Sequence, residues 1–225
     1  MINWNGLISL LLACMEFILM INLLIFSEKN KINFMGITLV GILAVYQTLE
    51  FLMCALNLKY SYMAYLAFLD ISFLPPLNLY FILKYFRRNN KLHKALFIPA
   101  LAFAVYYLLV IDKFAVVSCS VFYASYSYPL GTFYGFFYYT PALYAIIFLS
   151  NRIKKTNDET KKILAKVLLG GLLFVFLPVI AAFMLLAFHN DRWLAAVESI
   201  MCKFAFVYAV CLSYFTLMNK KAVYE

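Results

Sequence analysis

Charged residues are scarce in this sequence: Asp, Glu, Lys and Arg make up 13% of its 225 residues, whereas 66% are hydrophobic. Soluble domains are about 25% charged and 45–50% apolar. The shortage of charge therefore excludes an ordinary soluble domain and predicts an integral membrane protein. The net charge of +9 does not indicate nucleic acid as a partner, because the basic residues fall in short loops between apolar runs, as orientation signals do.

Catalytic and metal-binding motifs are also missing. There is no HExxH motif, no nucleophile elbow and no paired His-Asp arrangement, so we expect no enzyme activity and no catalytic residues. The two histidines, His93 and His189, fall in loops on opposite sides, and no CxxC occurs, so we expect no metal site. The five cysteines predict no disulfide framework: Cys119 stands without a partner in a loop, and the others fall inside apolar runs, namely Cys14, Cys54, Cys202 and Cys211.

Long apolar runs are what the sequence has in abundance. Runs of about 20 apolar residues match the thickness of a bilayer core. They predict an all-α, polytopic bundle of seven transmembrane helices in a single domain, with spans at about 7–26, 34–56, 62–85, 95–111, 133–150, 163–188 and 194–218. The first run lacks a basic start and a cleavage motif, so we interpret it as a retained helix rather than a signal peptide.

The loop charges predict the orientation. Basic residues in short loops favour the cytoplasmic side. If the chain has seven spans, three basic residues fall on one side of the membrane, namely Lys59, Lys113 and Arg192. Fifteen basic residues fall on the other side: Lys29, Lys31, Lys84, Arg87, Arg88, Lys91, Lys94, Arg152, Lys154, Lys155, Lys161, Lys162, Lys166, Lys220 and Lys221. We therefore expect the amino terminus outside, the carboxyl terminus in the cytoplasm, and a location in the bilayer of a bacterial cytoplasmic membrane.

Three further local features of the sequence carry structural or functional predictions. The tyrosine-rich run 123–139 fits an interfacial aromatic belt, which we favour, or a lid over a ligand. Pro75 and Pro76 are candidates for a hinge, and Pro178 is a further candidate that fits an ordinary kink. Gly170 and Gly171 predict close helix packing.

Five ionisable residues fall inside the predicted spans, where charged side chains are costly and seldom face lipid. They are the candidate site residues, and they line a predicted polar cavity: Asp70, Lys203, Glu50, Glu16 and Glu198. Counted along helices of 1.5 Å per residue, Asp70, Lys203, Glu50 and Glu16 share the outer half of the bundle, and Glu198 lies nearer the surface. By depth, Asp70 is the first candidate to pair with Lys203 and Glu50 the second. Such a pair could line a ligand or ion pocket, or only lock the helices in register.

One stretch resembles a known family. The run FLPPLNLYFILKYFRR resembles the signature helix of the histidine-kinase N-terminal seven-transmembrane sensor domain, with Pro75, Pro76, Phe81 and Tyr85 at the matching positions. The run LAVYQTLEFL, which holds Glu50, is similar to the second helix of that family. Members continue into a kinase or another output domain, whereas this sequence stops after its last predicted helix.

The resemblance implies a sensory receptor. A small ligand, or the state of the membrane, would act on the outer polar cavity, and the signal would pass to a cytoplasmic partner such as a histidine kinase. Alternatively, the chain is the sensor portion of a longer protein. The ligand itself is unknown.

Two alternatives remain. The spacing of Asp70, Phe73 and Pro76 is similar to the third helix of microbial rhodopsins, which implies retinal bound to Lys203 as a Schiff base. Ser199 stands where those proteins carry a carboxylate, and no Trp precedes Pro178 in the sixth helix. A small transporter is the other alternative, favoured by the carboxyl groups within the spans, although no duplicated half is visible.

Overall fold

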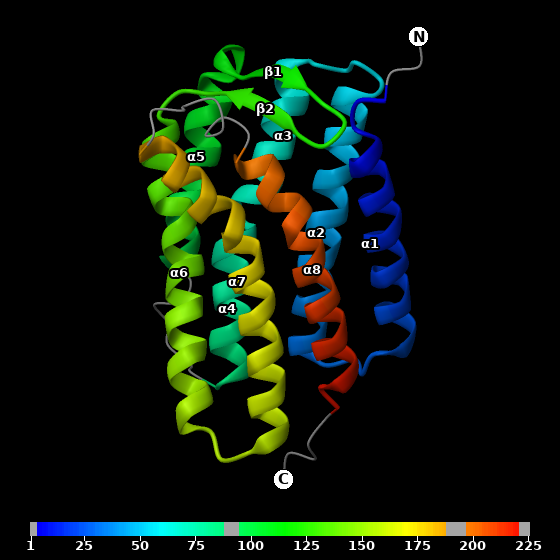
Figure 1. Cartoon of the computed structure of the whole chain (residues 1–225), viewed down its shortest axis with the longest axis vertical. Helices are drawn as coiled ribbons and strands as arrows, with labels where there is room; N and C mark the ends of the chain where they lie inside the picture. Colours follow the sequence, from blue (N-terminus) through cyan, green and yellow to red (C-terminus); the bar gives the residue numbers. More distant parts are fainter. Residues whose placement is uncertain (1–3, 88–94, 188–196, 221–225) are drawn as a thin grey trace.

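The computed structural model describes residues 4–87, 95–187 and 197–220, and it is a bundle of helices with a small sheet at one end (Figure 1). The helices are α1 (Leu7–Phe26), α2 (Lys31–Cys54), α3 (Ser61–Ser72), α4 (Leu74–Tyr85), α5 (Ile98–Leu109), α6 (Gly131–Lys155), α7 (Glu159–Ala187) and α8 (Val197–Met218), with a 3-10 turn η2 (Ile111–Lys113). The strands are β1 (Ala115–Cys119) and β2 (Ala124–Ser127).

The bundle has the length and surface of a membrane domain. Within the described ranges, six helical stretches are long and apolar enough to cross a bilayer, with α3 and α4 together forming one of them, Ser61–Tyr85. Large apolar side chains point outward along whole helices, as Leu11, Ile18 and Ile25 do on α1. A surface this apolar is characteristic of contact with lipid. The prediction of an all-α membrane helix bundle is confirmed at this level. The helical stretch Ala95–Leu109 is shorter than the others.

Prolines divide the predicted third span into two helices. Pro75 and Pro76 have no N–H to donate to Ile71 and Ser72, so α3 ends at Ser72 and α4 begins with both prolines in its first turn. Phe73 between them keeps helical angles (φ −85°, ψ −13°), so the chain continues in one direction. Pro178 lies inside the continuous helix α7, and α6 contains a further internal proline, Pro141.

The close packing predicted from the two glycines is found at one of them. A Cβ atom on Gly171 would lie 2.7 Å from the Tyr208 ring and 2.9 Å from Cys211 Sγ, so α8 packs against α7 where the side chain is missing. A Cβ atom on Gly170 would meet nothing within 4 Å.

A β-hairpin covers one end of the bundle, and the sequence patterns did not predict it. β1 and β2 pair antiparallel, with an irregular register between Val116 and Ser118. The turn is closed by Ser120, whose hydroxyl accepts hydrogen bonds from the backbone N–H groups of Phe122 and Tyr123. The hairpin lies at the end where α1 begins and α2 ends, which we call the hairpin end (Figure 1).

Three tyrosines of the tyrosine-rich run turn inward instead of facing lipid. Tyr126, Tyr134 and Tyr138 are buried. Tyr134 packs against Phe68 of α3, with ring centroids 4.3 Å apart, and Tyr128 stacks on Phe114 at 5.7 Å. The favoured interpretation of this run as an aromatic belt is therefore wrong for these tyrosines, which fill the space beneath the hairpin.

A disulfide joins the hairpin to α2, which corrects the prediction that Cys119 has no partner. Cys54 is the last residue of α2 and Cys119 the last of β1, and their Cα atoms lie 5.5 Å apart. Gly6 packs against this bridge: a Cβ atom there would lie 3.2 Å from Cys54 Cβ, and the residue has φ +75°. Its backbone N–H also donates to the carbonyl of Ser120 at 3.0 Å. The start of α1, the end of α2 and the hairpin thus form one connected cap.

The opposite end, where α1 joins α2 and α6 joins α7, carries most of the described basic residues, and we call it the basic end (Figure 1). Asn33 of α2 and Asn219 after α8 bind each other: Asn219 Nδ2 donates to Asn33 Oδ1 at 2.7 Å, and Asn33 Nδ2 donates to the Asn219 carbonyl at 3.3 Å. Asp158 begins α7 by accepting a bond from the backbone N–H of Lys161, and this bond lowers the pKa of Asp158.

Candidate functional site

The candidate site is a cluster of polar side chains buried between α1, α2 and α8. It consists of Ser9, Gln47, Glu50, Ser199 and Lys203, which we call the polar cluster. Lys203 Nζ lies 2.7 Å from Glu50 Oε1, and the two side chains are only 3% and 1% exposed. It is the only buried salt bridge among the described residues. The other two lie on the surface and join Lys161 to Asp158 and Lys162 to Glu159.

Every donor of the buried ammonium is used. Lys203 Nζ also donates to Gln47 Oε1 at 2.7 Å and to Ser9 Oγ at 3.0 Å. Ser9 Oγ in turn donates to Glu50 Oε1 at 2.9 Å, and Gln47 Nε2 donates to the Cys202 carbonyl at 2.9 Å. A buried ion pair is tolerated only where further hydrogen bonds satisfy both charges, and this one meets that condition.

The second oxygen of Glu50 connects the polar cluster to the hairpin. Ser199 Oγ donates to Glu50 Oε2 at 2.9 Å and accepts a bond from the backbone N–H of Ala124, the first residue of β2, at 3.0 Å. The hydroxyl of Tyr46 lies 3.5 Å from that of Tyr126 on β2, and Lys203 Nζ lies 6.0 Å from the centre of the Tyr46 ring. The Ser199 hydroxyl therefore links the hairpin backbone directly to the buried carboxylate of Glu50.

Sequence reasoning chose the wrong first partner for Lys203. Asp70 is partly buried on α3, and its Oδ2 atom has no hydrogen-bond partner in the described structure. Glu50, the second candidate, forms the pair instead. Depth alone suggested Asp70, but pairing also requires the two side chains to reach each other, and among the described residues Lys203 forms its salt bridge with Glu50.

The other two predicted site residues lie outside the polar cluster. Glu16 is buried on the inward face of α1, seven residues from Ser9 and so about 10 Å further along the helix. Neither of its carboxyl oxygens has a hydrogen-bond partner among the residues described. Glu198 lies in the first turn of α8, and its side chain is outside the described part of the structure.

The sequence contained a signal for the residues that were missed. Gln47 precedes Glu50 by three positions, and Ser199 precedes Lys203 by four, so each polar residue shares a helix face with a charged one. Ser9 had a weaker signal of the same kind, because Glu16 lies seven residues later on the same buried face of α1. The described ranges contain no group of three or more His, Cys, Asp and Glu side chains placed to hold a metal ion.

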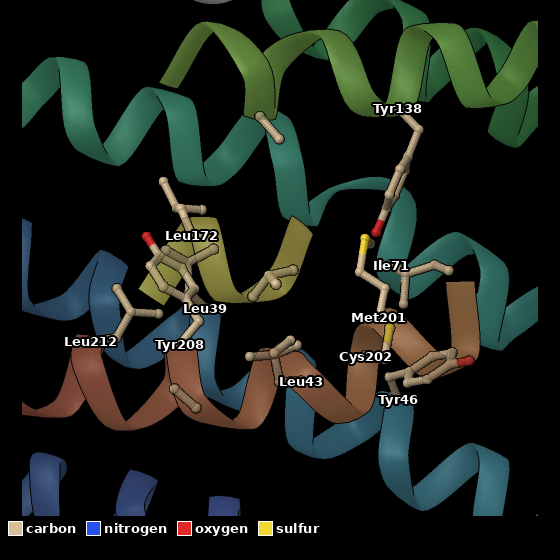
Figure 2. Close-up of a cluster of buried hydrophobic side chains, with 14 of the residues drawn as sticks. Leu39, Leu43, Tyr46, Ile71, Tyr138, Leu172, Met201, Cys202, Tyr208 and Leu212 are labelled. Atoms are coloured by element: carbon tan, nitrogen blue, oxygen red, sulfur yellow. The ribbon is translucent and has the colours of Figure 1, made fainter. Parts of the chain in front are cut away.

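A small apolar cavity of about 50 Å³ lies beside the polar cluster. Figure 2 shows Tyr138 of α6 reaching toward Met201 of α8 in this region, with Leu43 of α2 below them. Cys202 lines the cavity, whereas Lys203 is not among its lining residues. Pockets that bury a ligand the size of retinal are about 300 Å³ or larger. The site therefore does not fit a retinal Schiff base: the cavity is too small, and Lys203 Nζ is held by three hydrogen bonds.

Fold and site together define an all-α membrane helix bundle whose interior holds a fully hydrogen-bonded ion pair beneath a disulfide-linked hairpin. Comparison with protein-family models, characterised proteins and solved structures found no match for this chain.

Proposed function

We propose that this chain is a membrane sensor that responds to a small ligand or to the state of the membrane at its hairpin end and signals to a cytoplasmic partner. One observation carries the proposal: Ser199 bonds both the hairpin backbone at Ala124 and the buried carboxylate of Glu50. An ion pair that only locked the helices in register would not need this connection to a surface element. The resemblance of residues 73–88 to the signature helix of histidine-kinase sensor domains supports the same class.

The orientation proposed for this sensor has the hairpin end outside. Disulfides persist in oxidising compartments and are rare in the cytosol, and the Cys54–Cys119 bridge lies at the hairpin end. The basic residues lie at the other end, as the positive-inside rule requires of a cytoplasmic side. These are two independent observations in favour of one orientation. A seventh crossing by Ala95–Leu109, at 15 residues and about 22 Å, completes the topology that this orientation needs.

Helix α8 connects the two ends in this mechanism. It carries Ser199 and Lys203 near the hairpin, and at the basic end the residue that follows it, Asn219, binds Asn33. Movement of the hairpin would alter the hydrogen bonding of Glu50 and so the balance of charge around Lys203. Buried charges tolerate few arrangements, so a changed pairing would shift α8 against α1 and α2 as a unit. The cytoplasmic partner, such as a histidine kinase, would read that shift.

The test measures whether the Ser199 connection controls the basic end. Spin labels at Lys154→Cys and Lys220→Cys, both exposed positions, report the distance between α6 and the end of α8. Cys14, Cys202 and Cys211 are first replaced by alanine, and the disulfide is kept. Ser199→Ala is expected to shift or broaden the distance distribution. Ser213→Ala is the matched control, because this buried serine of α8 bonds only its own helix at Ala209. Equal distributions in both variants would contradict the sensor mechanism.

A small transporter is the second candidate, and Glu16 is the observation that favours it. A buried carboxyl group without hydrogen-bond partners is unusual, and such groups within membranes often belong to ion or proton pathways. Proteoliposomes loaded with a pH-sensitive dye distinguish the two functions. A transporter would give proton or ion flux that disappears in Glu16→Gln, whereas a sensor would give none in either protein.

A further inference from the structure

A groove of about 600 Å³ lies at the basic end, between the last turn of α1 and the first turns of α2. It is far larger than the cavity inside the bundle, and it lies at the other end of the molecule from the hairpin. The groove is lined by both basic and apolar side chains, and this combination indicates what kind of molecule it binds.

Lys29 and Lys31 are the basic lining residues. Both are exposed, and neither is joined to an acidic side chain by a salt bridge in the described structure. Glu28 also lines the groove, so two lysines and one glutamate leave a net charge of +1. The first turn of the 24-residue helix α2 contains no acidic residue, so the positive end of the helix dipole adds to the attraction for an anion.

Leu24 and Phe34 are exposed apolar lining residues of the groove. Leu24 is 49% exposed and Phe34 66% exposed, and the neighbouring residues Ile25 and Phe26 at the end of α1 are exposed as well. A free anion would gain nothing from these side chains. A molecule with an anionic head and a long apolar tail would contact both the basic and the apolar side chains.

The loop that carries Lys29 and the start of α2 that carries Lys31 are held in place by hydrogen bonds. Asn30 caps α2 by accepting a bond from the N–H of Asn33 at 2.8 Å. Asn33 Nδ2 donates to the Glu28 carbonyl at 3.0 Å, and the same residue binds Asn219 after α8. A loop fixed in this way loses little conformational freedom when it binds a ligand.

We propose that this groove binds an anionic phospholipid, with the phosphate between Lys29 and Lys31 and an acyl chain along Leu24 and Phe34. Basic side chains at the membrane surface attract anionic lipids by about 1 kcal/mol each. The proposal requires only that the bundle lies in a bilayer, and it stands whether or not the chain is a sensor.

The test uses the full chain in a neutral detergent, with phosphatidylglycerol and phosphatidylcholine of the same acyl chains titrated by native mass spectrometry. The variant Lys29→Gln/Lys31→Gln should bind phosphatidylglycerol on the order of 30-fold more weakly. The control Lys154→Gln/Lys155→Gln removes two exposed lysines from the same end but outside the groove, and it should retain the affinity. Equal losses in both variants, no loss in the groove variant, or equal binding of the two lipids would overturn the proposal.

A second variant distinguishes binding of a lipid from binding of free phosphate. Phe34→Ala should weaken phosphatidylglycerol while the lysines keep their positions, because Phe34 is exposed and its loss leaves the core intact. Inorganic phosphate at millimolar concentration should fail to displace the lipid. Displacement by phosphate, or unchanged lipid binding in Phe34→Ala, would show that the groove recognises phosphate alone and would overturn the lipid assignment.

Discussion

Lys203 on α8 and Glu50 on α2, separated by 153 positions in the sequence, form a 2.7 Å ion pair that is almost completely shielded from solvent. The pair is the only contact among the described residues in which two opposite charges meet inside the bundle. Because each charge depends on the other, this relationship gives the most direct test of the fold and of the site.

Removing one partner of the pair should be costly, and removing both should not. Lys203→Met and Glu50→Gln are each expected to lower the free energy of unfolding by about 3–5 kcal/mol, because the remaining charge stays buried and unpaired. The double variant should recover much of this loss. Thermal unfolding in detergent measures all three proteins. Lys203→Met combined with Asp70→Asn should instead be additive. Coupling to Asp70 and additivity with Glu50 would contradict the observed pairing.

The disulfide should stabilise the bundle although the cysteine pattern did not predict it. Cys119→Ser is expected to cost about 2–4 kcal/mol, because the bridge closes a loop between positions 65 residues apart. The double variant Cys54→Ser/Cys119→Ser should cost no more than the single one, since both remove the same crosslink. Cys14→Ser, an exposed position on α1, is the control. Melting temperatures that match between Cys119→Ser and Cys14→Ser would count against a stabilising role for the bridge.

Two neighbouring glycines should respond differently to the same substitution. Gly171→Ala places a methyl group 2.7 Å from the Tyr208 ring, and overpacking of this kind costs about 1–3 kcal/mol. Gly170→Ala meets nothing within 4 Å and should be neutral or stabilising by up to about 1 kcal/mol, because alanine favours the helix. Thermal unfolding of the two variants compares them directly. Equal effects would mean that α7 and α8 do not pack as closely as described.

Single cysteines test the proposed orientation. Lys59→Cys lies at the hairpin end and Lys154→Cys at the basic end, and both positions are exposed. In intact cells a membrane-impermeant maleimide should label position 59 only, and position 154 should react after permeabilisation. Cys14, Cys202 and Cys211 are replaced by alanine for this experiment, so that the label reports the new cysteine alone. Labelling of position 154 from outside would reverse the orientation.

The approximate limits of the long helices were contained in the sequence. A segment such as Leu7–Phe26 is fixed by length and polarity, because every backbone group in lipid must be bonded within the segment and about 20 residues are needed to cross. The prediction matched α1 at both ends. The break before Pro75 was also local, because a proline removes one donor from its own helix.

Which side chains meet was decided by the tertiary structure. Asp70 and Glu50 were candidates of similar depth, yet only Glu50 reaches Lys203, because each residue of a helix turns the side-chain direction by about 100° and the choice of neighbouring helices sets the rest. Cys54 and Cys119 needed the hairpin to bring them together. The hairpin in turn contacts two helices that are distant in sequence, with Tyr126 next to Tyr46 of α2 and the Ala124 N–H bonded to Ser199 of α8. The sequence determined the helices through local hydrogen bonding and length, and packing between distant segments determined the ion pair, the disulfide and the cap that covers them.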